Sequence, residues 1–370
     1  MKIPFVDLKA QYATIRNEIE KEVKDVFESQ YFILGSKVTE FEDKIARYCG
    51  SSHAIGCASG TDAILLALMA LNVGPGDEII TTPYTFFSTS GSIVRLGAKP
   101  VFCDINPETF NINPEGIESL ITEKTKAILV VHLYGLMADM DRIHDIAQNH
   151  NLPVIEDAAQ AIGSAIKDMK AGTLGAMGCF SFFPTKNLGG AGDGGMVVTD
   201  DDGLAEKVSI LRVHGSNPKY YHSMIGINSR LDALQAAVLR TKMNYLDTWS
   251  GKRRENASLY NHMLEEKGLS DFVVAPIIPE GYTHIFNQYV LRVDRRNELR
   301  EHLKNQDIGT EIYYPVPLHL QECFAYLGYK TGDFPVSEEA ADTTLALPIY
   351  PELTDEMQEY VVDSIAAFYR

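Results

Sequence analysis

Short apolar runs that alternate with helical stretches constrain the fold of this chain more than any other feature. The segment from Asp77 to Asp200 contains the runs DEIITTPYTFF, KPVFCDI, TKAILVVHLYG, LPVIEDAAQ, CFSFFPTK and GGMVVTD. Each has the length of a strand, and Met140 to Asn149, just before LPVIEDAAQ, has the apolar period of a helix. This βαβ alternation is typical of a mostly parallel sheet flanked by helices. We therefore expect a doubly wound α/β fold.

Further helices and strands are expected on both sides of this region. Helical periodicity covers Tyr12 to Ser29 and about Arg230 to Leu246. Later in the chain we expect FNQYVLRVD and DIGTEIYYPVPL as strands, and two helices, Asn297–Gln306 and Asp355–Ala367. A chain of 370 residues commonly divides into domains. We expect a large α/β domain with an N-terminal arm over residues 1–245 and a small α+β domain over residues 246–370.

Charge and cysteine content exclude several kinds of partner. Acidic residues outnumber basic ones 50 to 33, a formal net charge of -17, which disfavours binding to nucleic acid or an anionic membrane. The N-terminus lacks the apolar stretch of a signal peptide, and no later run has the length of a membrane span. The 5 cysteines are scattered, without the C-x-x-C pairs of metal sites. We expect a cytoplasmic protein with reduced thiols and no metal.

One lysine stands in an unusual setting. Lys186 lies in SFFPTKNLGG, an aromatic run that ends in a proline and then turns through glycines. Apolar surroundings lower the pKa of a lysine because burial disfavours its charged form, and the neutral amine can then attack an aldehyde to form an imine. A lone lysine after a strand is more often a surface residue. The imine-forming role therefore depends on the residues that lie near Lys186.

Polar residues follow the apolar run LPVIED. Asp157 ends this run, at the carboxyl edge where open α/β sheets bind their ligands. A carboxylate there could keep a pyridine nitrogen protonated, so that the ring withdraws electrons. Glu156 would point to the opposite face of the strand. Gln160 could donate to an oxygen on the same ring. The alternative for Asp157 is a helix cap.

A possible phosphate site precedes the apolar stretch Ile64–Leu71. The sequence SGTDA, from Ser59 to Ala63, brings glycine, hydroxyls and free backbone N–H groups to a helix N-terminus. Gly60 and Thr61 could hold a phosphate there, or the motif could simply cap the helix. Phe86, in PYTFF, could stack on an aromatic cofactor, although an aromatic residue in a strand usually belongs to the core.

Together these motifs resemble the DegT/DnrJ/EryC1/StrS sugar aminotransferases, a family of fold type I pyridoxal-phosphate enzymes. The resemblance covers nearly the whole chain, in the order IPFVDLKAQY, ILGSKVTEFE, ASGTDAILL, VGPGDEIITTPYTFFST, GAKPVFCDI, VIEDAAQAIG, SFFPTKNLGG, GDGG, GINSRLDALQAA and YYPVPLHLQ. It implies pyridoxal 5'-phosphate as cofactor and transfer of an amino group from glutamate to a nucleotide-linked ketosugar. The product would serve a surface polysaccharide, such as lipopolysaccharide, or a glycosylated metabolite.

The resemblance also implies roles for the candidate residues around the cofactor. Lys186 would form the Schiff base, Asp157 would bind the pyridine nitrogen and Gln160 would contact the ring hydroxyl. Phe86 would stack on the ring. The protein would be a homodimer with shared active sites. The phosphate would be held by Gly60, Thr61 and Ser181 of one subunit and by Asn228 of the second subunit.

Substrate contacts and the reacting carbon follow from the same resemblance. Arg230 could accept the carboxylate of the amino donor or form an ion pair at a helix start. Tyr313 and Tyr314 lie in the stretch that lines the sugar-nucleotide site in this family. The sequence KNLG with GDGG resembles enzymes that act at carbon 3, whereas many that act at carbon 4 have Glu at the position of Asp193. We therefore expect the amino group to be transferred to carbon 3 of the sugar, with carbon 4 as the alternative.

Three other functions remain as alternatives. Sugar dehydratases of the family have histidine in place of the lysine, so Lys186 argues against that reaction. A non-catalytic regulatory protein could use the same fold, but it would not need the complete set of site residues. A nucleotide-binding oxidoreductase would need a G-x-G-x-x-G motif between a first strand and helix, and the sequence has none there.

Overall fold

The central sheet forms because the apolar runs become its strands. The computed structural model describes the whole chain, residues 1–370. Its central sheet has 7 strands in the order β1-β9-β8-β5-β4-β2-β3. Their bounds are β1 His53–Cys57, β2 Glu78–Thr81, β3 Lys99–Phe102, β4 Thr125–Val131, β5 Val154–Asp157, β8 Met177–Ser181 and β9 Gly195–Thr199. The strands from β8 to β3 pair in parallel, and β9 pairs antiparallel with β8 and β1. The predicted α/β fold with a mostly parallel sheet is confirmed.

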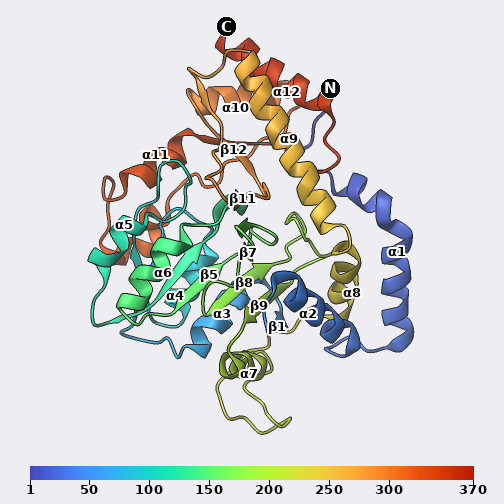
Figure 1. Cartoon of the computed structure of the whole chain (residues 1–370), viewed down its shortest axis with the longest axis vertical. Helices are drawn as coiled ribbons and strands as arrows, with labels where there is room; N and C mark the ends of the chain where they lie inside the picture. The colour runs from blue at the N-terminus through green and yellow to red at the C-terminus, as the bar shows by residue number, and fades with distance from the viewer.

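Helices cover both faces of this sheet (Figure 1). Successive residues of β4 point to opposite faces: Ile128 and Val130 pack with α2, α6 and α8, whereas Ala127 and Leu129 pack with α3, α4 and α7. Both faces are therefore buried, which explains why the strands read as continuous apolar runs. The helices of this part are α1 Leu8–Ser29, α2 Ser36–Cys49, α3 Gly60–Ala70, α4 Ser88–Arg95, α5 Pro114–Ile117, α6 Met140–Asn149, α7 Asp202–Leu211 and α8 Ala233–Lys242.

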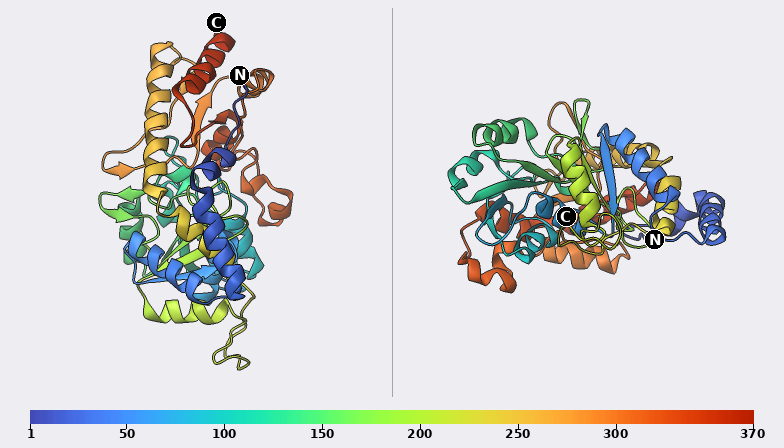
Figure 2. Two further views of the ribbon diagram at one scale, coloured as in Figure 1. Left: turned by 90° about the vertical axis from the view of Figure 1, so that its right-hand side faces the viewer. Right: turned by 90° about the horizontal axis from the view of Figure 1, so that it is seen from below.

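A second hydrophobic core is built around the second half of α9, a helix that carries the chain away from the central sheet (Figure 1). It includes Tyr260, Leu291 and Val361, and also Ile3, whose backbone pairs with that of Ile308. Both termini lie at this end of the molecule (Figure 2). The division into domains near residue 245 stays a prediction. The elements here are α9 Leu246–Glu266, β10 Val273–Val274, β12 Tyr289–Val293, α10 Arg296–Asn305, α11 Pro335–Thr343, β13 Thr344–Leu347 and α12 Asp355–Tyr369.

A small sheet and four short 3-10 helices complete the structure. The sheet has the order β11-β6-β7 and joins the two parts of the chain, because β11 follows α9 whereas β6 and β7 follow β5. Its strands are β6 Ala165–Ile166, β7 Met169–Lys170 and β11 Tyr282–Thr283. The 3-10 helices are η1 Glu118–Leu120, η2 Leu133–Gly135, η3 Leu318–Leu320 and η4 Glu322–Leu327. None of the helices has both the length and the apolar surface needed to cross a bilayer.

Two expectations from the periodicity were wrong. The helix expected to about Leu246 ends at Lys242, and α9 begins at Leu246 after a short turn. Helix α9 was missed because the polar stretch from Ser250 to Arg254 interrupts its apolar pattern. The segment DIGTEIYYPVPL forms only isolated bridges, at Ile308 and Glu311. Its two prolines have no N–H to donate to a ladder, so a regular strand cannot continue there.

Candidate active site

A cavity of about 400 Å³ opens beyond the carboxyl ends of β4, β5 and β8. This is the edge at which open α/β sheets bind ligands, because loops and helix N-termini gather there. Part of its wall is the first turn of α3, and another part is the segment that follows β2. Many of the predicted site residues line this cavity, namely Gly60, Thr61, Phe86, Asp157, Gln160, Ser181, Lys186 and Tyr313.

Lys186 lies in a tight turn just after β8. The turn closes through hydrogen bonds from the Lys186 N–H to the Phe183 carbonyl at 2.9 Å and from the Gly190 N–H to the Phe182 carbonyl at 2.8 Å. A Cβ atom on Gly189 would lie 2.2 Å from the carbonyl oxygen of Pro184, so the turn requires glycine there. Burial lowers the pKa of the Lys186 amine to about 8, against the opposing effect of the Asp157 carboxylate. The neutral, nucleophilic form is therefore accessible near neutral pH.

Asp157 is a buried carboxylate at the end of β5. The Thr89 hydroxyl donates to its Oδ2 atom at 2.8 Å, and the Ala159 N–H donates to Oδ1 at 3.3 Å. Burial raises the pKa of Asp157, and these two hydrogen bonds and the Lys186 amine oppose that rise. A buried carboxylate with so few partners favours a positively charged group in the cavity beside it. A protonated pyridine nitrogen has this charge.

The neighbouring carboxylate, Glu156, points away from the cavity, as the alternation of the strand predicts. The Nδ1 atom of His132 accepts the Ala138 N–H at 3.1 Å, so its Nε2 atom carries the proton and donates to Glu156 at 2.8 Å. Burial opposes ionisation of Glu156, but hydrogen bonds from His132 and the backbone outweigh it and lower its pKa. The backbone donors are the N–H groups of Gly172, Leu174 and Gly175.

Gln160 has a fixed amide orientation. Its Oε1 atom accepts the backbone N–H of Tyr134 at 2.7 Å, and its Nε2 atom donates to the hydroxyl of Tyr314 at 3.1 Å. The second N–H of this amide can therefore serve an oxygen of a ligand in the cavity. Tyr314 lies behind the cavity wall, where it contacts Gln160 and the ring of Phe86, whereas Tyr313 lines the cavity. Burial raises the pKa of Tyr313 to about 12.

The first turn of α3 forms a close-packed cradle with the end of β8. The Ser59 hydroxyl caps the helix by accepting the Asp62 N–H at 3.1 Å. A Cβ atom on Gly60 would lie 2.6 Å from the Cβ atom of Ser181, so only glycine allows this approach. Thr61 follows in the same turn, where helix N–H groups lack partners within the helix. The motif thus caps the helix and also offers an anion site beside a hydroxyl.

Phe86 lies in a turn, which corrects the expectation of a strand through this position. Strand β2 ends at Thr81 and α4 begins at Ser88. The ring of Phe86 is 55% exposed and lines the cavity. It is therefore available to stack on a planar ligand, which a core residue would not be.

Two predicted residues besides Tyr314 lie outside the cavity of their own chain. Asn228 is exposed at the base of a loop that projects beyond α7 (Figures 1 and 2), and its backbone pairs with that of Val213. Arg230 is half-buried and precedes α8, which begins at Ala233. The sequence had offered an ion pair at a helix start as an alternative role for Arg230, but Arg230 precedes the first residue of α8.

Several hydroxyl and amide side chains at the site were not predicted. Thr89 binds Asp157, and the other hydroxyl and amide residues of the cavity wall that were not predicted as site residues are Ser59, Thr85, Ser88, Thr185 and Gln288. The hydroxyl-rich stretch TTPYTFFSTS, which begins at the last residue of β2, was the available signal for three of the six. Nothing local in the sequence indicates Gln288, which comes from the second part of the chain.

Comparison with known proteins identifies the family. Residues 13–366 match the sequence pattern of the DegT/DnrJ/EryC1/StrS aminotransferase family. The chain belongs to this family. It is thus a pyridoxal-phosphate-dependent enzyme of the sugar aminotransferase class, and the resemblance inferred from the motifs is confirmed.

Two relatives illustrate the range of functions within the DegT/DnrJ/EryC1/StrS family. A protein of Geobacillus stearothermophilus named pleiotropic regulatory protein is 54% identical over 100% of this chain and 99% of its own length. A UDP-N-acetyl-3-dehydro-alpha-D-glucosamine 3-aminotransferase of Acidithiobacillus ferrooxidans is 45% identical over 96% of this chain and 94% of its own.

Solved structures of the family share the fold and contain the cofactor chemistry. Streptomyces venezuelae DesV, solved with a ketimine intermediate, has a TM-score of 0.96 and 39% identity, covering 99% of this chain and 98% of its own. Bacillus subtilis NtdA, solved with the aminated cofactor PMP, has a TM-score of 0.91 and 32% identity, covering 98% and 84%. The cofactor of this family is pyridoxal phosphate, and the cavity offers it an amine, a buried carboxylate and an anion cradle.

Proposed function

We propose that this enzyme transfers the amino group of glutamate to carbon 3 of a nucleotide-linked ketosugar. One observation carries this proposal: the amine of Lys186 and the carboxylate of Asp157 meet in one cavity, although they come from the ends of different strands. In the balanced reaction glutamate becomes 2-oxoglutarate, and the C=O group of the sugar becomes a carbon with one hydrogen and an amino group. The two half-reactions share one site, so ping-pong kinetics are expected.

Bound pyridoxal phosphate supplies an electron-withdrawing ring, which makes the α-carbon of the donor acidic. Lys186 would hold the cofactor through its amine, and the same amine would carry the proton of the donor's α-carbon. Asp157 would pair with the ring nitrogen, and the free N–H of Gln160 would serve the ring oxygen. Phe86 would stack on the ring and limit the access of water. The hydrogen bonds of Asp157 and Gln160, the lowered pKa of Lys186 and the exposure of Phe86 to the cavity support these roles.

The phosphate group is proposed to bind at the start of α3. Gly60, Thr61 and Ser181 surround this position in one chain, and Asn228 of a second copy completes it. The exposure of Asn228 on a projecting loop supports the shared arrangement. The same loop exposes apolar side chains that a partner would cover, Tyr220, Tyr221 and Ile225. A homodimer with shared sites follows.

The sugar nucleotide is proposed to enter past Tyr313, with Tyr314 behind it, while Arg230 receives the carboxylate of glutamate. Asp193 lines the cavity, and its presence supports transfer of the amino group to carbon 3 of the sugar, as does the name of the Acidithiobacillus relative. Carbon 4 remains the alternative. The product would enter a surface polysaccharide, such as lipopolysaccharide, or a glycosylated metabolite. The four buried free thiols, Cys49, Cys57, Cys103 and Cys179, support a reducing, cytoplasmic location.

A regulatory protein on the same fold is the second candidate, favoured by the name of the Geobacillus relative. One experiment separates the candidates: the purified enzyme is given glutamate and a panel of UDP- and dTDP-linked 3-ketosugars and 4-ketosugars. We expect amination of a 3-ketosugar, with the new C–N bond located by NMR. Faster turnover of a 4-ketosugar would contradict the carbon assignment. A cofactor band that glutamate does not bleach, with no turnover of any sugar, would favour the regulator.

A further inference from the structure

Helix α8 holds the turn that carries Lys186 through two of its side chains. The Nζ atom of Lys242 donates to the carbonyl of Gly189 at 2.7 Å. About two turns earlier in the helix, the Oε1 atom of Gln235 accepts the N–H of Ala191 at 2.8 Å. A Cβ atom on Gly190 would lie 2.8 Å from this same Oε1 atom, so the glycine makes room for the amide. The glycine-rich segment is thus fitted to α8.

Lys242 is a buried cation without an acidic partner. Its side chain is 8% exposed, and burial is the single cause that lowers its pKa, to about 8. Burying an ammonium group is unfavourable, and an aliphatic side chain of similar length would avoid this cost. Lys242 supplies a hydrogen-bond donor to the Gly189 carbonyl, and a buried carbonyl without a donor is itself destabilising. A directed hydrogen bond, more than packing, accounts for a lysine here.

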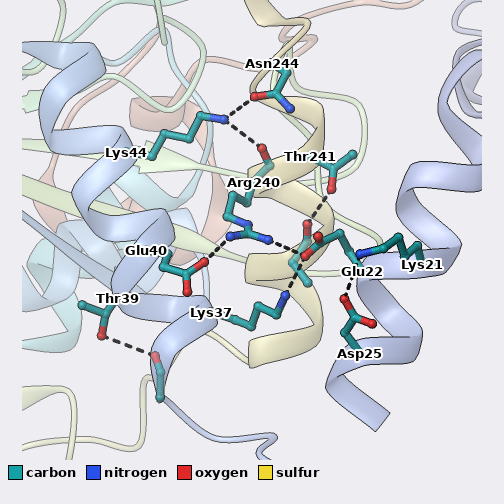
Figure 3. Close-up of polar contacts among 12 residues, drawn as sticks. Lys21, Glu22, Asp25, Lys37, Thr39, Glu40, Lys44, Arg240, Thr241 and Asn244 are labelled. Carbon is teal, nitrogen blue, oxygen red and sulfur yellow. Dashed lines mark hydrogen bonds and ion pairs between the residues drawn. The ribbon is translucent and has the colours of Figure 1, made fainter. Parts of the chain in front are cut away.

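The opposite side of α8 is held by the two N-terminal helices, as Figure 3 shows. Arg240 forms ion pairs with Glu22 of α1 and Glu40 of α2, and Lys44 of α2 donates to the Arg240 carbonyl at 3.2 Å. Residues two apart in a helix point in nearly opposite directions, so Lys242 faces away from this cluster. Helix α8 therefore presents Lys242 to the turn from a fixed position.

The start of the turn has its own anchor. The Nδ2 atom of Asn187 donates to the Ile285 carbonyl at 3.0 Å, and both residues are buried. Asn187 and Lys242 thus hold the two sides of a short segment, and Lys186 lies next to the first anchor. Removal of Lys242 leaves the far side of this segment with the Gln235 contact as its side-chain anchor, and removal of Asn187 leaves the near side without one.

We propose that Lys242 is a positioning residue, whose ammonium group holds the Gly189 carbonyl and thereby fixes the turn from Lys186 to Asp193. This inference rests on the proposed role of Lys186 as the residue that binds the cofactor aldehyde. Reaction requires the amine within roughly 3 Å of its target, and small displacements cost large factors in rate. Lys242 acts through the turn and touches neither cofactor nor substrate.

The test compares Lys242→Met, Lys242→Arg and Lys207→Met with the parent protein. Lys207, half-buried on α7, also donates to a backbone carbonyl, that of Ala70 at 3.3 Å, but outside the cavity wall. Hydrogen exchange of the cofactor-free proteins is measured by mass spectrometry. In Lys242→Met we expect exchange of residues 187–194 to be about tenfold faster, because one fixed hydrogen bond is lost. Lys242→Arg, which retains a donor, should restore part of the protection, and Lys207→Met should leave this segment unchanged.

The same proteins are then loaded with pyridoxal phosphate and assayed. We expect kcat of Lys242→Met to fall by about 10 to 100 fold with the KM for glutamate little changed, because the turn is displaced and the donor site is not. Unchanged exchange in the turn, or unchanged kcat, would overturn the proposal. A parallel Lys186→Ala sample isolates the underlying assumption: if it still forms the cofactor absorbance band, the role of Lys186 is wrong, whatever Lys242 does.

Discussion

The hydroxyl of Thr89 donates to the Oδ2 atom of Asp157 at 2.8 Å, and both side chains are buried. Thr89 belongs to α4, whereas Asp157 ends β5, so the contact depends on how helix and sheet pack. Burial raises the pKa of Asp157, and the hydrogen bond from Thr89 counteracts this rise. Thr89 therefore keeps Asp157 available as an anion for the proposed pyridine contact.

Replacement of Thr89 by valine should shift the pH dependence of catalysis. The change removes a hydrogen bond to the ionised carboxylate, so the pKa of Asp157 rises further and its anionic form is lost at a higher pH. We expect the acid limb of the kcat/KM profile to move upward, with about tenfold lower activity at its lower end. Thr89→Ser keeps the hydroxyl and should retain the parent profile. An acid limb that does not move in Thr89→Val would contradict this role.

Glu156 should contribute to stability and not to the chemistry. Glu156→Gln keeps the shape but loses the anion that accepts hydrogen bonds from His132 and three backbone N–H groups. We expect a loss of about 3 kcal/mol in the free energy of unfolding of the cofactor-free protein, measured with urea. The exposed Glu255, on α9, supplies the control, since Glu255→Gln should change this free energy by less than about 0.5 kcal/mol.

The contribution of Glu156 should also depend on pH in a defined direction. Its pKa is lower in the folded protein than its ordinary value, so the unfolded state binds the proton more readily. The stabilisation is complete above the unfolded pKa and is lost as the pH falls through the lower, folded pKa. Stability of the parent protein should therefore fall more steeply below about pH 4.5 than that of Glu156→Gln. Parallel slopes for the two proteins would contradict this assignment.

The shared site can be tested by subunit mixing. Asn228→Ala and Lys186→Ala homodimers should each be poorly active, since every site lacks one proposed contact. A hybrid dimer has one site in which both lesions fall together and one intact site, so exchange of subunits should restore part of the activity. Exchange is checked with two different affinity tags. No recovery after proven exchange would count against Asn228 acting across the interface.

The sequence alone predicted those parts of the fold and site that depend on residues close together in the chain. The central strands, the position of Asp157 at the end of β5 and the glycine turn after Lys186 follow from apolar runs and their boundaries. These features need only the period of a strand and the conformational freedom of glycine. The same reasoning placed Glu156 on the opposite face from Asp157, where the structure has it.

Contacts between distant elements could not be predicted in this way. Thr89 and Lys242 look like ordinary helix residues, and their partners become known only when α4 and α8 are packed against the sheet. Phe86 was misplaced in a strand because Tyr84, Phe86 and Phe87 have high strand propensity and closely follow β2, which ends at Thr81. The role of Asn228 depends on a second subunit and that of Arg230 on the bound amino donor, so neither local pattern nor the single chain tests them.

Lys186→Ala should abolish transamination without unfolding the chain. The substitution removes both the amine that binds the cofactor aldehyde and the proposed proton carrier. Its midpoint of thermal unfolding, measured without cofactor, should stay close to that of the parent protein, because a half-buried cation is replaced by a small apolar side chain. Lys207→Ala, at a site outside the cavity, should retain activity. Wild-type turnover by Lys186→Ala, without added amine, would contradict the assignment.

The most direct test locates the covalent bond itself. The protein is loaded with pyridoxal phosphate and treated with borohydride, which converts the bond between the cofactor aldehyde and a lysine amine into a stable secondary amine. The labelled protein is digested and its peptides are identified by mass spectrometry. The account predicts one modified lysine per chain, Lys186, and no label in Lys186→Ala. Stoichiometric labelling of any other lysine, with Lys186 unmodified, would contradict it.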